Sequence, residues 1–301
     1  MAEALHHDFG FRTPYLMPDP DRLLRTLYKA ADAVRQTPGR RGRFVQLQDV
    51  DDVLIAGDLH GHVPNFQAIY NTADLAHHPR RHLVLQEVIH GRTYYPLGGD
   101  KSHQLLDLFA ALKTQYPRQV HLIMGNHELS QWTDRAVMKN DAELNGLFVV
   151  GVYEAYGDEK GAAILAAYFR LFGVLPLALR TPNRIFISHS LPRAKCLEAF
   201  DLRFIETDAF PAEDLSVGGP VYELLWGRDT RPNNCAAFLR KVESDWLVSG
   251  HISLDTGFAF PGPQHVIVDC CESPAAYTLL PANRPLTSAE FTAAPRLLHT
   301  S

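Results

Sequence analysis

The chain has 301 residues, 46% of them hydrophobic and 21% charged, with a formal net charge of −5 at pH 7. Such values are typical of a folded protein with one large α/β domain, and they exclude a disordered or collagen-like chain. The acidic balance gives no overall basic surface for nucleic acid, and no apolar run approaches the ~20 residues that cross a bilayer. We therefore expect neither a nucleic-acid partner nor a membrane-spanning segment.

The N-terminus and the cysteines indicate the compartment. Residues 1–11 lack the basic region and the apolar core of a signal peptide. The four cysteines form no C-x-x-C pair, and the adjacent Cys270 and Cys271 do not readily bridge each other. We therefore expect a reduced, cytoplasmic protein.

Turn residues and apolar periodicity divide the chain into helices and strands. An irregular arm over 1–17 and a helix over 21–34 form an N-terminal helical arm of about 1–45. Short apolar runs ended by glycine or a polar turn predict buried strands at 53–56, 83–88, 120–124, 185–188, 246–249 and 265–269. Further helices are predicted at 64–75, at 103–115 with Ser102 as the cap, and over most of 131–180. With no linker or repeat, we expect a single domain over 1–301 whose motif-bearing core spans about 50–280.

Short polar motifs follow four of these strands. They are G-D-L-H-G at 57–61, G-N-H-E at 125–128, S-H-S at 188–190 and G-H at 250–251. Open α/β sheets build their sites at the ends of strands, so the Asp, Asn and His side chains of these motifs are expected to gather there. A mixed set of oxygen and imidazole ligands suits Mn, Fe or Zn better than a metal that prefers thiolates. The pattern predicts a hydrolase with two metal ions.

The four motifs, in this order and spacing, resemble those of the calcineurin-like metallophosphoesterases, and within them the phosphoprotein (Ser/Thr) phosphatase branch. The third motif is followed by L-P at 191–192, as in the family, and weaker similarities are L-P-L at 175–177 and L-L-W at 224–226. The resemblance implies an α/β sandwich of two mixed β-sheets packed face to face and flanked by α-helices. It also implies two metal ions at the strand ends, with Asp58, His60 and His251 holding one ion. Asn126 and His189 would hold the other.

The resemblance also assigns the catalytic step to His127. Two metal ions would clamp the phosphate and generate a hydroxide that attacks phosphorus in line. His127 would then act as the general acid that protonates the leaving alkoxide, a role typically worth ~10²–10⁴ in rate.

The chain departs from the family at one motif. The family's second block reads G-D-x-x-D-R-G, and its first Asp bridges the metals. The corresponding segment here, 83–92, reads LVLQEVIHGR. Counting from Asp58 to the end of the strand places Glu87 where the bridging Asp belongs. Asp100, which lies thirteen residues after Glu87 and past a loop insertion, is the second candidate.

The same departure affects two further roles. Counting along the segment places His90 at the position of the family's second Asp, which orients the catalytic histidine. Asp100 is the alternative for this role if its loop folds back towards the site. Arg92 corresponds to the family's phosphate-binding arginine if the alignment with the family's second block is shifted by one residue. Arg228 is the second candidate, because it resembles an arginine in bacterial and phage members of the branch. Arginine suits this task because its planar fork pairs with two phosphate oxygens.

These features favour a metal-dependent phosphomonoesterase that acts on a phosphorylated protein or a small phosphorylated molecule. Mn and Fe are the expected metals, with Zn and Mg as alternatives. The walls of the pocket, not the metal ligands, choose the substrate, so a phosphodiester or dinucleotide-polyphosphate hydrolase is the second hypothesis. The third is a degenerate pseudo-phosphatase, a binding module with a weakened metal site, which the missing block motivates.

Overall fold

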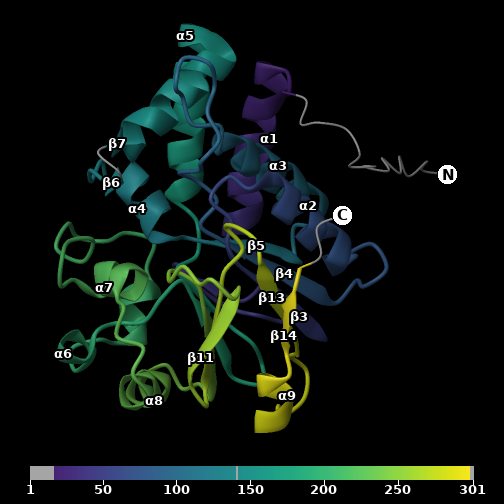
Figure 1. Cartoon of the computed structure of the whole chain (residues 1–301), viewed down its shortest axis with the longest axis vertical. Coiled ribbons are helices and arrows are strands. Elements are labelled where there is room, and N and C mark those ends of the chain that lie inside the picture. Colours follow the sequence, from purple (N-terminus) through teal and green to yellow (C-terminus); the bar gives the residue numbers. More distant parts are fainter. Residues whose placement is uncertain (1–16, 140–141, 299–301) are drawn as a thin grey trace.

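Two β-sheets form the centre of the protein (Figure 1), in a computed structural model that describes residues 17–139 and 142–298. The seven-stranded sheet has the order β1 (Arg40–Arg41), β2 (Phe44–Gln46), β8 (Ala178–Arg180), β9 (Ile185–Ser188), β10 (Trp246–Ser249), β12 (His265–Val268) and β11 (Phe258–Gly262). The five-stranded sheet has the order β14 (Pro295–Leu297), β13 (Ala276–Pro281), β3 (Asp52–Asp58), β4 (Arg81–Gln86) and β5 (Val120–Ile123). Each sheet contains parallel and antiparallel neighbours. The predicted sandwich of two mixed β-sheets is therefore confirmed.

The central strands are buried on both faces because successive side chains enter two different apolar layers. On β3, Val53 and Ile55 belong to the layer between the sheets, whereas Leu54 and Ala56 belong to the layer beneath the helices. A strand that is covered on both faces reads as an unbroken apolar run. This is why the central strands are recognisable in the sequence.

Helices cover the outer faces of the sandwich. α1 (Pro20–Arg35), α2 (Val63–Ala73), α3 (His103–Gln115) and α5 (Leu144–Phe172) gather on one side, where α1 packs against α3 and α5 (Figure 1). α6 (Ala194–Leu197), α7 (Pro220–Trp226) and α8 (Pro232–Lys241) lie at the lower left in Figure 1. α4 (Asn126–Trp132) packs against both α5 and α7, and the 3-10 helix η1 (Leu202–Ile205) packs against α7. The remaining elements are the hairpin of β6 (Met138–Lys139) and β7 (Ala142–Glu143) and the short α9 (Ser288–Thr292). None of the helices in the described ranges is both long and apolar enough to cross a membrane.

Most predicted elements are confirmed, with small shifts at their ends. α1 begins at Pro20, and the Asp19 carboxylate caps it by accepting a hydrogen bond from Arg22 N at 2.9 Å. Ser102 precedes α3 but does not cap it, because its hydroxyl donates to Asp100 instead. The prediction of helix over most of 131–180 is correct for α5 and wrong before it, where the β6–β7 hairpin separates α4 from α5. The predicted irregular arm lies, up to residue 16, outside the described residues.

The two sheets meet beside the polar strand ends. Asp58, the last residue of β3, forms an isolated parallel bridge with Asp269, which follows β12. Gly57 allows this approach, because a Cβ at that position would lie 2.1 Å from the carbonyl oxygen of Val268. The bridge therefore fixes the ends of strands from both sheets next to each other.

Two stacked histidines on β4 and β5 predict a loss of stability in acid. His82 Nδ1 lies 2.9 Å from His121 Nε2, and both side chains are buried. Burial, reinforced by the charge of Lys113, lowers the pKa of His82 from 6.5 to about 4 and that of His121 well below its usual range. In the unfolded chain His82 therefore binds a proton below about pH 6.5, whereas in the folded chain it binds a proton only near pH 4. The free energy of unfolding must fall as the pH falls through this window.

We expect His82 alone to cost the wild-type protein about 2 kcal/mol of stability between pH 7 and pH 5. A His82→Gln, His121→Gln double variant should lose less over the same interval, as measured by urea unfolding at the two pH values. His77→Gln is the matched control, because the His77 side chain is 80% exposed, and it should follow the wild type. The same pH dependence in the double variant and the wild type would contradict this prediction.

Candidate metal centre

Seven of the predicted site residues come together at one edge of the sandwich. β3, β4 and β5 run parallel to one another, as do β9 and β10. The carboxyl ends of parallel strands meet at the same edge, so residues that follow them meet although they lie far apart in the chain. The residues that the structure brings together in this way are Asp58, His60, Glu87, Asn126, His127, His189 and His251.

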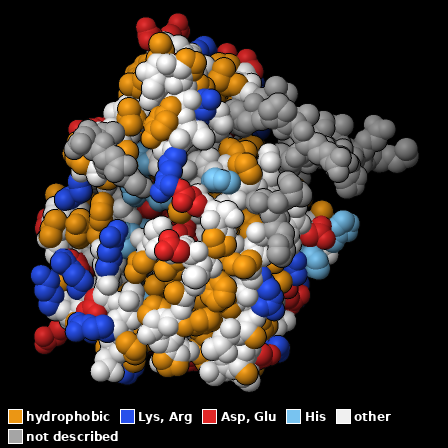
Figure 2. Space-filling model, viewed as in Figure 1, with side chains coloured by type: hydrophobic (Ala, Val, Ile, Leu, Met, Phe, Trp, Pro, Cys, Tyr) orange, Lys and Arg blue, Asp and Glu red, His pale blue; other side chains and the backbone are white. Residues whose placement is uncertain are grey.

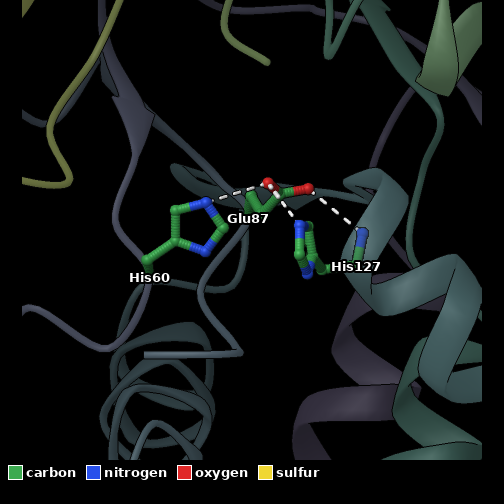
Figure 3. A group of neighbouring side chains, drawn as sticks. All are labelled: His60, Glu87 and His127. Carbon is green, nitrogen blue, oxygen red and sulfur yellow. Dashed lines mark hydrogen bonds and ion pairs between the residues drawn. The ribbon is translucent and has the colours of Figure 1, made fainter. Parts of the chain in front are cut away.

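Glu87 lies at the centre of this group, between His60 and His127 (Figure 3). Its Oε1 is 3.2 Å from His60 Nε2 and 3.9 Å from His127 Nε2. Its Oε2 is 3.1 Å from His189 Nε2 and accepts a hydrogen bond of 3.1 Å from the backbone N of His127. The two oxygens of one buried carboxylate thus face different imidazoles.

Gly125 makes room for Glu87. A Cβ on Gly125 would lie 2.3 Å from Glu87 Oε2 and 2.8 Å from Glu87 Cβ. Any larger residue would therefore push the carboxylate out of its place. The glycine that opens the second motif is therefore required by the position of the Glu87 side chain.

Asp58 holds the opposite side of the group. Its Oδ2 accepts a hydrogen bond of 2.9 Å from the backbone N of His251, and its Oδ1 lies 3.7 Å from His189 Nδ1. The Nε2 of His189 is also 2.9 Å from Asn126 Oδ1. His189 is therefore placed between two carboxylates and an amide.

The donor atoms form two groups that share Glu87. One contains His60, Glu87 and His127, and the other contains Asp58, Glu87 and His189, with the ligand atoms of each group within 4.8 Å of one another. Both groups are only candidate sites, so the assignment of Asp58, His60 and His251 to one ion and of Asn126 and His189 to the other stays a prediction. Glu87 is the residue that the two groups have in common.

Burial of two carboxylates creates a demand for positive charge. Burial raises the pKa of Asp58 to about 7, although nearby His189 opposes the rise. Burial also works against ionised Glu87, yet the charges of His189 and His127 hold its pKa well below the usual range. Burial disfavours the cation of His60 too, but its bond to Glu87 raises its pKa to about 9. Positive charge on the imidazoles thus balances Glu87.

This donor set fits divalent cations. His189 Nδ1 is buried and has no hydrogen-bond partner among the described residues, which is costly for a polar atom unless it binds something else. Carboxylate oxygens, an amide oxygen and imidazole nitrogens are ligands for Mn, Fe, Zn and Mg, and no thiolate is among them. A divalent cation would also replace the protons that now balance Glu87.

His127 is linked to a buried histidine. His127 Nδ1 lies 2.7 Å from His90 Nδ1, and His90 Nε2 lies 3.0 Å from Gln131 Oε1. The amide oxygen of Gln131 can only accept a hydrogen bond, so His90 Nε2 carries a proton. Burial lowers the pKa of His90, which favours the neutral ring. Neutral His90 then accepts at Nδ1, and His127 Nδ1 donates to it. His127 Nε2 is left facing the donor group.

Asp100 organises the loop that carries His90. Its carboxylate accepts hydrogen bonds from Gly91 N at 3.0 Å, from Ser102 N at 2.8 Å and from the Ser102 hydroxyl at 2.7 Å. The same hydroxyl accepts a hydrogen bond of 2.9 Å from the backbone N of His90. Among the described residues, no hydrogen bond or ion pair joins Asp100 to Glu87 or His127. The structure therefore places Asp100 behind His90 and outside the donor groups.

The two candidate phosphate-binding arginines lie in different surroundings. Arg228 Nε donates to His251 Nε2 at 3.0 Å, so its exposed guanidinium lies at the edge of the metal centre. Arg92 is 61% exposed and forms an ion pair with Glu272. Of the two, only Arg228 is hydrogen-bonded to one of the seven gathered site residues, in the described part of the chain.

Two supporting residues have no role in the sequence-based expectations. The buried carboxylate of Glu128 accepts hydrogen bonds from Val88 N at 2.8 Å and Gly125 N at 3.0 Å, which ties β4 to the start of α4. Gln131 fixes His90, as described above. A signal was present for both, because Glu128 stands at the capping-box position after Gly125 and Gln131 stands four residues after His127 on the same helix face.

Four site residues have left-handed backbone. The φ angles are 40° at His60, 37° at Glu87, 60° at His90 and 68° at His251. Residues other than glycine pay roughly 1–3 kcal/mol for such conformations. The strand-end turns therefore aim these side chains at one another at the cost of local strain.

Comparisons with known proteins agree with this geometry. A model of the calcineurin-like phosphoesterases matches residues 52–262. The chain is 23% identical over 223 residues to serine/threonine-protein phosphatase 5 of Rattus norvegicus and 25% identical over 223 residues to that of Homo sapiens. Both matches cover 68% of this chain and 40% of the relative, so the chain spans less than half the length of these relatives.

Solved structures share the fold. A protein serine/threonine phosphatase from Saccharomyces cerevisiae, described as similar to human phosphatase PP5, has a TM-score of 0.65 at 16% identity. That match covers 91% of this chain and 86% of the other. A cold-active protein-tyrosine phosphatase from a psychrophilic Shewanella species has a TM-score of 0.56 at 14% identity, covering 88% and 84%.

Proposed function

Because the chain belongs to the calcineurin-like phosphoesterase family, and is thereby a phosphoric ester hydrolase, we propose that it hydrolyses phosphomonoesters with two metal ions. The observation that carries this proposal is the position of Glu87, whose two oxygens face His60 and His189 at 3.2 and 3.1 Å. A single carboxylate shared by two donor groups is the arrangement that a two-metal site requires. The similarity to Ser/Thr phosphatases favours phosphoserine or phosphothreonine as the substrate group.

The proposed ligands are side chains at the strand ends around Glu87 and Asp58. When bound, the ions supply a polarised phosphoryl oxygen and a water molecule of lowered pKa. Glu87 bridges the two donor groups in place of the family's aspartate, and Mn or Fe is the expected metal. The other ligands are Asp58, His60, Asn126, His189 and His251.

His127 is proposed to deliver the proton that the leaving alkoxide needs. Its Nδ1 donates to His90, so the proton to be transferred is the one that Nε2 carries when the ring is protonated, and Nε2 faces Glu87. Burial lowers the pKa of His127 to about 3, while Glu87 opposes this shift. A bound phosphate dianion adds negative charge beside the ring and favours the protonated form needed for transfer. His90 is proposed as a positioning residue, with Asp100 holding its loop.

Arg228 is proposed to bind the phosphate. Its guanidinium group is exposed beside His251. A guanidinium group is planar and can donate two parallel hydrogen bonds to two oxygens of one phosphate. Arg92 remains the second candidate for this role, and it would first have to leave Glu272.

Hydrolysis of p-nitrophenyl phosphate by Mn²⁺-loaded protein tests the proposal, with a chelator-treated sample as the control. We expect turnover that requires the metal and a content of two ions per chain. Absence of turnover together with one ion or none would support the pseudo-phosphatase. Faster turnover of bis(p-nitrophenyl) phosphate or of a dinucleotide polyphosphate than of monoesters would instead establish the second hypothesis.

A further inference from the structure

A groove lined by basic side chains runs from the metal centre across α6 and α8. Two cavities of about 620 and 820 Å³ adjoin each other there and share Ala194 and Arg231 in their walls. The smaller one is also lined by Arg228, which donates to His251 at the metal centre. The cationic side chains of this basic groove are Arg193, Lys195, Arg228, Arg231, Arg240 and Lys241.

The positive charge of the basic groove is only partly compensated. Its walls contain two carboxylates, Glu198 and Asp229. Asp229 pairs with Arg231 at 2.6 Å, and buried Glu223 pairs with Arg193. The four cations without a carboxylate partner among the described residues are Lys195, Arg228, Arg240 and Lys241.

The location of these charges is unusual for this chain. Figure 2 shows Lys and Arg side chains gathered at the lower left of the molecule, where Figure 1 places α6 and α8. The chain as a whole carries a net charge of −5. A concentration of positive charge next to the reaction site therefore selects for anionic ligands at that site.

We propose that the basic groove binds acidic residues that flank the phosphorylated residue of a protein substrate. This inference rests on the proposed phosphatase function and adds to it the class of substrate. The phosphoryl group lies at the metal centre, and Arg228 marks the point at which the metal centre and the groove meet. Carboxylates on one side of the phosphoresidue then face Lys195, Arg240 and Lys241.

The uncharged part of the lining favours a peptide over a nucleotide. It consists of aliphatic side chains and Pro232, one hydroxyl, Thr230, and two amides, Asn233 and Asn234. None of the described lining residues is aromatic, so the groove offers no surface on which a base would stack. Exposed Asn233 offers the donor and acceptor that an extended peptide backbone needs. The length of two adjoining cavities also suits a chain better than a compact ligand.

Charge reversal in the groove tests the proposal without touching the metal centre. The test variant is Lys195→Glu, Arg240→Glu, and the matched control is Arg25→Glu, Lys29→Glu on α1, away from the groove (Figure 1). Both pairs are exposed and remove the same charge. The substrates are p-nitrophenyl phosphate and three phosphothreonine peptides of equal length, whose flanking residues are acidic, neutral or basic.

We expect the wild type to have the highest kcat/KM on the acidic peptide and the lowest on the basic one. The groove variant should lose about tenfold in kcat/KM on the acidic peptide, since each exposed ion pair contributes modestly and the variant reverses two charges. It should keep its turnover of p-nitrophenyl phosphate, which does not reach the groove. The control variant should behave as the wild type. The preference should also weaken as salt rises from 0.05 to 0.5 M, because the charges are exposed.

The outcomes separate this inference from the proposed function. Equal kcat/KM for the three peptides, or an equal loss on the acidic peptide in both variants, would overturn the inference while phosphatase activity stands. A higher kcat/KM for a dinucleotide polyphosphate than for the acidic peptide would also overturn it. Should p-nitrophenyl phosphate not be hydrolysed at all, the proposed function fails. Fluorescence anisotropy with a labelled acidic phosphopeptide then still reports whether the groove binds it and whether the groove variant does not.

Discussion

Replacing Glu87 by glutamine should remove both metal binding and turnover. The substitution keeps the shape of the side chain but removes the charge that faces His60 and His189. Breaking a buried ionic arrangement by deleting one partner costs about 3–5 kcal/mol, which corresponds to roughly 10²–10⁴-fold weaker metal binding. We expect Glu87→Gln to retain at most one Mn²⁺ per chain after gel filtration, as counted by mass spectrometry of the metal, and to lose turnover of p-nitrophenyl phosphate.

Two companion variants make this prediction specific. Glu87→Asp keeps the charge and restores the family's residue, so it should retain more metal than Glu87→Gln. Asp100→Asn should retain both ions, because Asp100 bonds to Gly91 and Ser102 and not to the donor groups. Loss of an ion in Asp100→Asn, with two ions still bound in Glu87→Gln, would show that Asp100 is the bridging ligand instead.

Replacing His127 by asparagine should slow only those reactions whose leaving group needs a proton. We expect turnover of an alkyl phosphate, such as a phosphoserine peptide, to fall by about 10²–10⁴. Turnover of p-nitrophenyl phosphate should change much less, because nitrophenolate leaves without being protonated. The comparison of the two substrates in one variant is the measurement, and it needs no correction for the amount of active protein.

The metal content of the His127→Asn variant shows whether His127 is a general acid or a metal ligand. His127 Nε2 lies 3.9 Å from Glu87 Oε1 and belongs to one of the donor groups. A general acid can be removed without loss of metal, so the asparagine variant should still bind two ions. Loss of an ion, or an equal loss of rate on both substrates, would assign His127 to the metal instead of to the proton.

Six strands, β3, β4, β5, β9, β10 and β12, and the gathering of polar residues at their ends could be predicted from the sequence. Buried parallel strands read as apolar runs, and the residue that ends each run is where an α/β sheet presents its ligands. Glu87 could be placed by counting because no insertion separates it from the end of β4. The edge strands could not be placed in this way. β14 begins with Pro295, and β11 contains Pro261 and is half-exposed, so neither gives an unbroken run.

The contacts of the loop over 89–101 could not be predicted either. From residue spacing alone, His90 and Asp100 are both candidates for orienting His127. In the structure, Asp100 supports the loop from which His90 contacts His127. The pairing of Arg92 with Glu272 brings together residues from distant parts of the chain. Loop contacts of this kind carry no periodic signal, because they depend on how two irregular segments fold against each other.

Left-handed backbone at His60, Glu87, His90 and His251 sets the stability of this protein against its chemistry. Glycine at any of the four positions would relieve the strain and leave the turn intact. The same substitution would delete the side chain and its contacts, and for buried Glu87 that loss outweighs the strain relieved. The four turns keep their conformation because the surrounding sandwich over-determines it. A circular dichroism or unfolding measurement of a glycine variant therefore reports the difference between these two opposing effects and not the strain alone.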